Sequence, residues 1–308
     1  MPKLSIMIPC YYSEENIPVT INELLENEKN FPEEVSFEYV MVDDGSKDNT
    51  YNLLCDFKNN FPDKVKVVKL SGNFGSYNAL QAAMKYATGD INVVIAVDLQ
   101  DPPELMIKMY EHWKKGYKLV LANRNEREDS FLTRIFAETY QRMMKKFALP
   151  NLPSGGFDYC MFDKQLRDQV VEMNESNNNC LYLLIWMNYD YVAIPYTRRQ
   201  RLIGKSRWTL KKKIKLFVDS FASFSYAPLR MITITGLLLG IIAFLYALYV
   251  IIARLNGMIN VEGWTAMIVV FLVVSAFQMI AIGIIGEYLW RNLEASRKRP
   301  PYIVDKVL

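Results

Sequence analysis

The chain has 308 residues, with 36 Lys and Arg against 33 Asp and Glu, so its formal charge is only +3. This length is enough for one large domain or two smaller ones with a hydrophobic core. Four widely spaced cysteines without a C-x-x-C pair argue against a zinc site, and the single histidine, His112, argues against histidine-based catalysis or a histidine-ligated metal.

The first 123 residues alternate between short apolar runs and stretches with helical spacing of apolar residues. Runs rich in Val and Ile predict strands at 4–10, 37–44, 64–70, 91–98 and 117–123. Helical spacing predicts helices at 15–30, 47–61, 76–89 and 103–116. This alternation is typical of an α/β domain with a mostly parallel sheet and helices on both faces. In such sheets a ligand binds where the strands end, so the residues that follow the strands are the candidates for a site.

The second predicted strand ends in the first acidic motif, VDDGSKDNT (42–50). On its own it indicates a turn, with Asp48 or Asn49 as the cap of the next helix. Adjacent carboxylates at a strand end can also accept hydrogen bonds from a base N–H or from ribose hydroxyls. Asp43 and Asp44 are therefore candidates for a nucleotide site.

The fourth predicted strand ends in the second acidic motif, AVDLQDPPE (96–104). Asp98 is expected to end that strand, and Asp101 is expected to be a helix N-cap ahead of the prolines. A carboxylate and an amide oxygen two residues apart on extended chain, as in Asp98 and Gln100, suit a hard cation such as Mg²⁺ or Mn²⁺. No glycine-rich dinucleotide motif or P-loop follows the first strand.

A basic segment, RRQRLIGKSRWTLKKKIK (198–215), contains no acidic residue. From 209 onward, apolar residues recur at helical spacing while the lysines fall elsewhere round the helix. These apolar residues are Leu210, Ile214, Phe217, Val218, Phe221 and Phe224. The pattern predicts an amphipathic helix at 209–228 in the membrane interface, with a core helix bearing a solvated basic face as the alternative. No nucleic-acid recognition motif accompanies the basic segment, so no nucleic-acid partner is expected.

Two uncharged stretches, 231–253 and 265–286, are each slightly longer than the ~20 apolar residues that a helix needs to cross a bilayer. Buried core helices are shorter and usually keep one polar face, so a transmembrane hairpin at 229–290 is predicted, followed by a tail at 291–308. Four glycines would let the spans pack closely and are compatible with a homo-oligomer: Gly236, Gly240, Gly283 and Gly286.

The distribution of basic residues predicts the orientation in the membrane. Lys and Arg crowd before the first span and follow the second, whereas the short loop between the spans holds only Arg254 and Glu262. The N-terminus has no signal-peptide pattern. The soluble domain and both termini are therefore expected in the cytoplasm, with the protein in the cytoplasmic membrane.

Six segments of the chain form a recognisable series: IPCYYSEEN (8–16), NFGSYNALQAAMKYATGD (73–90), DLQDPPE (98–104), SGGFDYCMFDK (154–164), RRQRLIGKSRW (198–208) and FSYAPLR (224–230). Together they resemble family 2 glycosyltransferases of the GT-A fold, and within that family the membrane-anchored polyprenyl-phosphate glycosyltransferases. This group includes bactoprenol glucosyltransferases and is related to dolichol-phosphate mannose synthases. The resemblance covers nearly the whole chain and implies a Rossmann-like GT-A domain at 1–208. The chain departs from the family pattern at Tyr12, Ser13 and Ala96, the last standing where a metal-motif Asp is common.

The resemblance implies an inverting transfer of a hexose, most often glucose, from a UDP-sugar to undecaprenyl phosphate, for modification of cell-envelope glycans. It implies that Asp98 and Gln100 hold Mg²⁺ or Mn²⁺, and that Asp98, Asp158 and Arg201 are catalytic residues. Around the nucleotide it implies Pro9, Tyr11, Glu14, Asp43, Asp44, Asn73 and Asp98. Around the acceptor phosphate it implies Arg198, Arg201, Lys205, Ser206 and Arg207.

The acceptor chemistry explains why a basic segment would be needed. A lipid phosphate is already anionic at neutral pH, so it needs positioning and partial charge neutralisation more than deprotonation by a general base. Three alternatives stay open. The donor could carry another sugar, such as GlcNAc or mannose, or the acceptor could have a longer lipid chain. The protein could also be a regulatory membrane protein that binds a nucleotide sugar.

Overall fold

The computed structural model describes residues 1–124, 131–173, 179–200, 210–256 and 263–308. The chain divides into two compact units. The first unit consists of Met1–Ser220 together with Pro300–Leu308, and the second consists of Phe221–Arg299.

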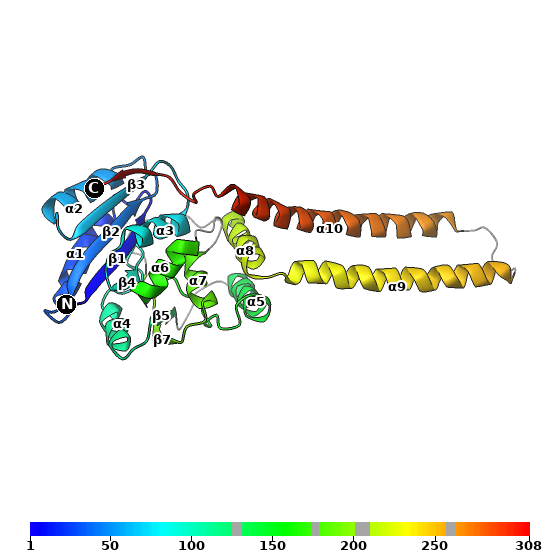
Figure 1. Ribbon diagram of the computed structural model, residues 1–308, viewed down its shortest axis with the longest axis horizontal. Coiled ribbons are helices and arrows are strands. Elements are labelled where there is room, and N and C mark those ends of the chain that lie inside the picture. Colours follow the sequence, from blue (N-terminus) through cyan, green and yellow to red (C-terminus); the bar gives the residue numbers. More distant parts are fainter. Residues whose placement is uncertain (125–130, 174–178, 201–209, 257–262) are drawn as a thin grey trace. The chain divides into compact units, whose positions relative to one another are not determined.

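The first unit is built on a mixed sheet (Figure 1), in which the described residues form eight strands in the order β7-β5-β6-β4-β1-β2-β3-β8. The strands are β1 (Lys3–Cys10), β2 (Ser36–Asp43), β3 (Val65–Leu70), β4 (Ile91–Val94), β5 (Leu119–Arg124), β6 (Cys160–Asp163), β7 (Tyr191–Tyr196) and β8 (Val304–Val307). Only β6 and β8 run antiparallel to their neighbours. The carboxyl ends of all the other strands therefore meet at one edge of the sheet.

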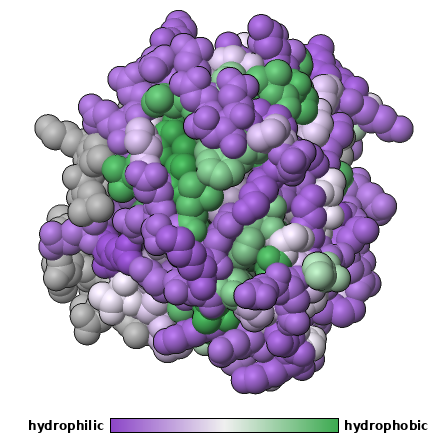
Figure 2. Space-filling view, turned by 90° about the vertical axis from the view of Figure 1, so that its left-hand side faces the viewer, coloured by the Kyte–Doolittle hydropathy of each residue, from purple (hydrophilic) through white to green (hydrophobic). Residues whose placement is uncertain are grey.

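Helices cover both faces of the sheet, as the alternating pattern predicts. On one face lie α1 (Ile17–Glu28), α2 (Thr50–Asn60) and α4 (Leu105–Lys114), which share a hydrophobic core with β1, β2 and β3. The opposite face is covered by α3 (Ser76–Tyr86), α6 (Lys164–Met173) and α7 (Cys180–Trp186). Figure 2 shows that the surface in view is mostly hydrophilic, with hydrophobic residues in small patches, as expected for a unit that buries its apolar side chains inside.

The five predicted strands and four predicted helices are all present, with ends shifted by a few residues. One strand boundary matters for function, because β4 ends at Val94 and not at Asp98. Three further strands, β6, β7 and β8, were not predicted. The short β6 pairs with both β4 and β5, and this insertion makes the sheet mixed in its middle.

The second unit contains two long apolar helices, α9 (Ala227–Leu255) and α10 (Trp264–Arg297). Both are long and apolar enough to cross a membrane, and only 6% and 0% of the residues in their most apolar windows are buried. A core helix of a soluble domain would bury one face, so these exposed helices are candidate membrane spans at the places that the sequence predicts. Near their polar ends, the hydroxyl of Tyr288 donates to the carbonyl oxygen of Ser225 at 2.6 Å.

The predicted amphipathic stretch and the predicted tail each have a defined structure. The helix α8 (Leu210–Phe224) occupies most of 209–228, and its Phe217 ring lies 5.6 Å from Tyr140 of α5 (Phe131–Phe147). The tail prediction at 291–308 differs from the structure, because α10 continues to Arg297 and Pro300–Leu308 belongs to the first unit. There β8 pairs antiparallel with β3 and covers its open edge.

Candidate active site at the carboxyl edge of the sheet

The loops that follow β1 and β2 interlock through short hydrogen bonds. The backbone N–H of Tyr12 donates to the Ser46 hydroxyl at 2.9 Å, and that of Ser13 donates to the Thr50 hydroxyl at 2.7 Å. The Glu14 carboxylate accepts from the backbone N–H of Asn49 at 2.9 Å, at the start of α2. These bonds join the loop of Pro9, Tyr11 and Glu14 to the loop of Asp43 and Asp44, so the structure brings these five predicted residues together.

Asp43 is fully buried at the end of β2 and is only partly satisfied. Its Oδ1 accepts from the backbone N–H of Ser46 at 3.0 Å. Its Oδ2 has no hydrogen-bond donor among the described residues. Burial raises the pKa of this carboxyl group above its ordinary value. A buried acceptor without a donor is costly, and a ligand N–H or hydroxyl group would satisfy it.

Asp44 is satisfied by the protein itself. Its two oxygens accept from the backbone N–H groups of Phe74 and Gly75, at 2.7 and 2.9 Å. Burial raises the pKa of Asp44 to about 6. Asp44 therefore holds the loop before α3, and in that loop the predicted nucleotide residue Asn73 is exposed at the surface.

The second acidic motif forms a turn and not an extended end of β4. Leu99 adopts the left-handed conformation with φ of +46°, and the backbone N–H of Gln100 lies 3.4 Å from Oδ1 of Asp98. Asp98 and Gln100 are both half-buried in this turn. Their carboxylate and amide oxygens are the hard ligands that Mg²⁺ and Mn²⁺ prefer, so the residues fit a divalent cation. Within the described part of the chain, no group of three or more His, Cys, Asp and Glu side chains gathers into a fuller metal site.

Asp101 has a different role from the one predicted. The expectation that it caps α4 is wrong, because that helix begins at Leu105 with Glu104 as its cap. Asp101 is 1% exposed, accepts a hydrogen bond from the hydroxyl of Tyr196, and pairs with Arg198, whose Nε lies 3.4 Å from its Oδ1. The carboxylate is thus used to attach the chain after β7 to the loop after β4.

The backbone joins the same two segments. The N–H of Arg199 donates to the carbonyl oxygen of Gln100 at 2.8 Å. The guanidinium of Arg199 pairs with Glu23 of α1 at 2.9 Å and with Glu104 at 2.7 Å. The basic segment therefore starts against the loop of Asp98 and Gln100. Its predicted phosphate residues Arg201, Lys205, Ser206 and Arg207 lie outside the described residues.

Asp158 is held by Arg124, which belongs to none of the sequence motifs. Its Oδ2 accepts from Nη2 of Arg124 at 2.6 Å, while 56% of its side chain stays exposed. Burial lowers the pKa of Arg124, but Asp158 and Tyr196 outweigh this effect and raise it above its ordinary value. Arg124 and Tyr196 end the adjacent strands β5 and β7, directly opposite one another. The signal that could have identified them was their position at strand ends.

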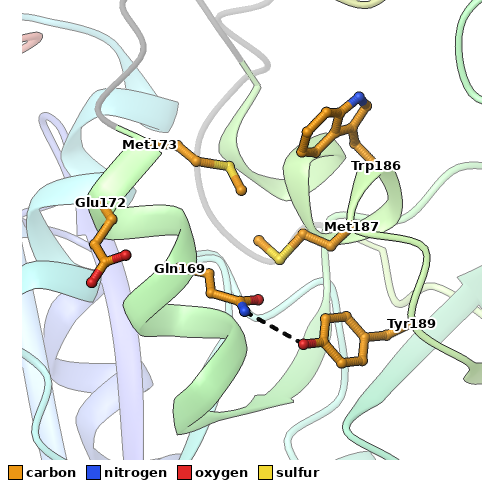
Figure 3. A pocket seen from close by; sticks show the side chains of 6 residues that line it. All are labelled: Gln169, Glu172, Met173, Trp186, Met187 and Tyr189. Atoms are coloured by element: carbon orange, nitrogen blue, oxygen red, sulfur yellow. Dashed lines mark hydrogen bonds between the residues drawn. The ribbon is translucent and has the colours of Figure 1, made fainter.

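A cavity of about 470 Å³ lies elsewhere on the first unit (Figure 3). It is lined by Gln169, Glu172, Met173, Trp186, Met187 and Tyr189. Tyr189 precedes β7, so this cavity lies toward the amino ends of the strands, opposite the acidic loops. It is therefore separate from the candidate active site.

The chain is an α/β protein with acidic side chains at the edge of the sheet where the parallel strands end. In proteins of this class, ligands bind at that edge. The fold is similar to that of the mannosyltransferase PcManGT from Pyrobaculum calidifontis, which was solved in complex with GDP-Man and Mn²⁺. The TM-score is 0.52 and the sequence identity is 16%, and the match covers 94% of this chain and 87% of that one. Residues 5–173 match the sequence model of glycosyl transferase family 2. The chain belongs to this family and is a glycosyltransferase.

Two relatives resemble the chain over nearly its whole length. An uncharacterized glycosyltransferase of Bacillus subtilis strain 168, YkcC, is 34% identical over 98% of this chain and 93% of its own length. The prophage bactoprenol glucosyl transferase homolog of Escherichia coli K12 is 32% identical over 99% of both chains. The predicted resemblance to family 2 is confirmed, and the similarity includes the region of the two candidate membrane spans.

Proposed function

We propose that the protein transfers a hexose, with glucose the first choice, from a UDP-sugar to undecaprenyl phosphate at the cytoplasmic face of the cell membrane, with inversion at the anomeric carbon. Near full-length similarity to relatives named as bactoprenol glucosyl transferases supports a lipid-phosphate acceptor. Two candidate spans would keep the chain in the bilayer that carries this lipid. The charge distribution supports an orientation with the first unit and both termini in the cytoplasm.

The proposed donor site uses the interlocked loops after β1 and β2. Pro9, Tyr11 and Glu14 would line the nucleoside pocket, and the buried Oδ2 of Asp43 would accept from the base or the ribose. Asp44 would contribute by holding the loop of Asn73.

Asp98 and Gln100 would hold the divalent cation on the side of the diphosphate. When bound, Mg²⁺ or Mn²⁺ neutralises charge that develops on the leaving nucleoside diphosphate. Because this chain has Ala96 where a further carboxylate is common, the diphosphate oxygens would supply more of the coordination. Cation affinity is then expected to be weak in the absence of nucleotide.

The proposed acceptor site lies where the basic segment begins. The hydrogen bond from Arg199 to Gln100 is the observation that carries the proposal, because it brings the start of a segment rich in Arg and Lys to the proposed donor side of the site. Arg201, Lys205, Ser206 and Arg207 would then surround the phosphate, with Arg198 oriented by Asp101. Asp158, which is exposed beside Arg124, is the remaining acidic side chain that we propose as a catalytic residue of the transfer.

The test is transfer of labelled glucose from UDP-glucose to undecaprenyl phosphate by the purified full chain, with and without Mn²⁺. Asp98→Asn should abolish most of the transfer, whereas Asp56→Asn, the same change at an exposed position of α2, should leave it unchanged. Transfer only from another nucleotide sugar would replace glucose in the proposal. Nucleotide-sugar binding without any transfer would favour the regulatory alternative, and full activity of Asp98→Asn would refute the metal assignment.

A further inference from the structure

One hydroxyl group connects the two ionic pairs at the carboxyl edge. Nε of Arg124 donates to the Tyr196 hydroxyl at 3.3 Å, and that hydroxyl donates in turn to Oδ1 of Asp101. On one side, Arg124 holds Asp158, and on the other, Asp101 pairs with Arg198. We call these five residues, Asp158–Arg124–Tyr196–Asp101–Arg198, the Tyr196 bridge.

The bridge is buried at its centre and exposed at one end. Asp101 is 1% exposed and Tyr196 is 6% exposed, whereas Asp158 is largely open to solvent. A buried carboxylate is stable only when its charge and its hydrogen bonds are satisfied. Removing one partner therefore changes how the others are held, and the Tyr196 hydroxyl contacts both halves of the bridge.

A second contact runs beside the bridge between the same loops. The hydroxyl of Tyr159, the residue after Asp158, lies 3.3 Å from the carbonyl oxygen of Pro102. The rings of Tyr159 and Tyr196 pack edge to face, with centroids 6.3 Å apart. Packing therefore fixes the ring of Tyr196 independently of its hydroxyl. The position of the strand does not depend on the hydrogen bonds that this hydroxyl makes.

We infer that Tyr196 is a positioning residue that couples the donor side of the site to the acceptor side. This inference rests on the proposed function. Asp98 and Gln100, the proposed donor-side residues, share one short turn with Asp101. Any adjustment of this turn on binding nucleotide and cation moves Asp101, and through it Arg198 at the start of the proposed phosphate-binding segment. We expect binding of one substrate to favour binding of the other, and linkage makes this effect reciprocal.

A purely structural role for the bridge makes a different prediction. Loss of the Tyr196 hydroxyl would then lower the melting temperature and reduce the binding of each ligand alone. A coupling role instead leaves each single affinity nearly unchanged and removes the dependence of one on the other. The two roles can therefore be separated by measuring binding without turnover.

The experiment uses the full chain in detergent with UDP and Mn²⁺ as the donor-side probe and undecaprenyl phosphate as the acceptor-side probe, a pair that cannot react. In the wild type, saturating undecaprenyl phosphate should tighten UDP binding by about fivefold or more. Tyr196→Phe, which keeps the ring, should reduce this change to less than about twofold while UDP affinity alone stays within about threefold.

Tyr191→Phe is the matched control. It removes a hydroxyl from the same strand, one that donates to the carbonyl oxygen of Asn151 at 2.8 Å and lies outside the bridge. It should keep the wild-type coupling. If Tyr196→Phe fails to fold, Arg124→Lys, which keeps the charge but loses the planar fork, serves as the second variant and should also weaken the coupling.

The outcomes separate this inference from the proposed function. If the wild type neither binds UDP nor transfers sugar, the proposed function fails. Two outcomes overturn the coupling role of Tyr196 while the proposed function stands. In the first, the wild type transfers sugar to the lipid phosphate but its UDP affinity does not change when undecaprenyl phosphate is added. In the second, Tyr196→Phe keeps the full coupling.

Discussion

Glu38 provides the sharpest test of the energetics of the first unit. It lies near the start of β2, only 2% exposed, where its carboxylate accepts hydrogen bonds from the hydroxyls of Ser5 and Thr88. It also pairs with Lys66 at 2.8 Å and with Lys3 at 3.3 Å. We predict that Glu38→Gln destabilises the fold, because the amide keeps the shape but loses both the charge and one acceptor.

The magnitude follows from the pKa of Glu38. Burial raises this pKa, but the bonds from Lys66, Ser5 and Thr88 outweigh burial and lower it from 4.5 to about 2. A shift of this size corresponds to roughly 3 kcal/mol of stability from the ionised group. Because the folded pKa lies below the unfolded one, this stability is fully present above the unfolded value and is lost as the pH falls toward the folded value.

Thermal melting of the full chain in detergent, followed by circular dichroism, measures the effect. A loss of roughly 3 kcal/mol should lower the melting temperature of a unit of this size by roughly 6–12 °C at pH 7. At pH 3 the difference from wild type should shrink to roughly half of its value in kcal/mol. The control is Glu26→Gln, whose side chain is 70% exposed in its pair with Lys29, and which should change little. Equal melting of the two variants at pH 7 would refute the reasoning.

Three further predictions concern the edges of the sheet. Because burial raises the pKa of Asp44 to about 6, sugar transfer should decline as the pH falls through this value and the carboxyl stops accepting two N–H groups, and Asp44→Asn should flatten that limb of the pH–rate profile. The pKa of Asp44 is higher in the folded chain than in the unfolded chain. Its contribution to stability is therefore fully present below the unfolded pKa, and it is lost as the pH rises through the folded value of about 6. Gly45→Ala should lower the melting temperature far more than Gly116→Ala. Both glycines have a positive φ, but only a Cβ at position 45 would lie 2.4 Å from the backbone of Gly72. Equal losses of melting temperature would show that this clash does not matter. Deletion of 303–308 should expose the edge of β3 and promote association, and an unchanged elution volume on size exclusion would count against a protective role for β8.

The parts of the fold that could be predicted from sequence are those specified by local patterns. Runs such as 37–44 and 64–70 contain closely spaced large apolar residues that are buried in the sheet, so their position needs no knowledge of distant residues. The interior of α9 is recognisable for the same kind of reason, since it lacks charge throughout. By contrast, β6 has only four residues, too few to show a period, and β8 depends on pairing with a strand more than 200 residues earlier in the chain, which no local pattern can reveal.

The same distinction applies inside the candidate site. Asp43 ends one buried strand, and Asp98 and Gln100 follow another, so their place at the carboxyl edge could be inferred, although the turn at Leu99 could not. The partners of Asp101 could not be inferred at all, because a local rule assigns an acid before two prolines to a helix cap, and burial overrides that rule.

Tyr196 shows why the residues that join a site are harder to find than those that make it. Its strand contains Pro195 and alternates between exposed and buried positions at the sheet edge, so it lacks the continuous apolar run of a central strand. Its hydroxyl acquires a role only because β7 pairs with β5 in a register that sets Tyr196 opposite Arg124. Substrate-contacting residues are constrained by chemistry and leave motifs, whereas a joining residue is constrained by register alone. A change of one residue in the pairing of β7 would turn Tyr196 to the other face of the sheet and break the bridge without altering any motif in the sequence.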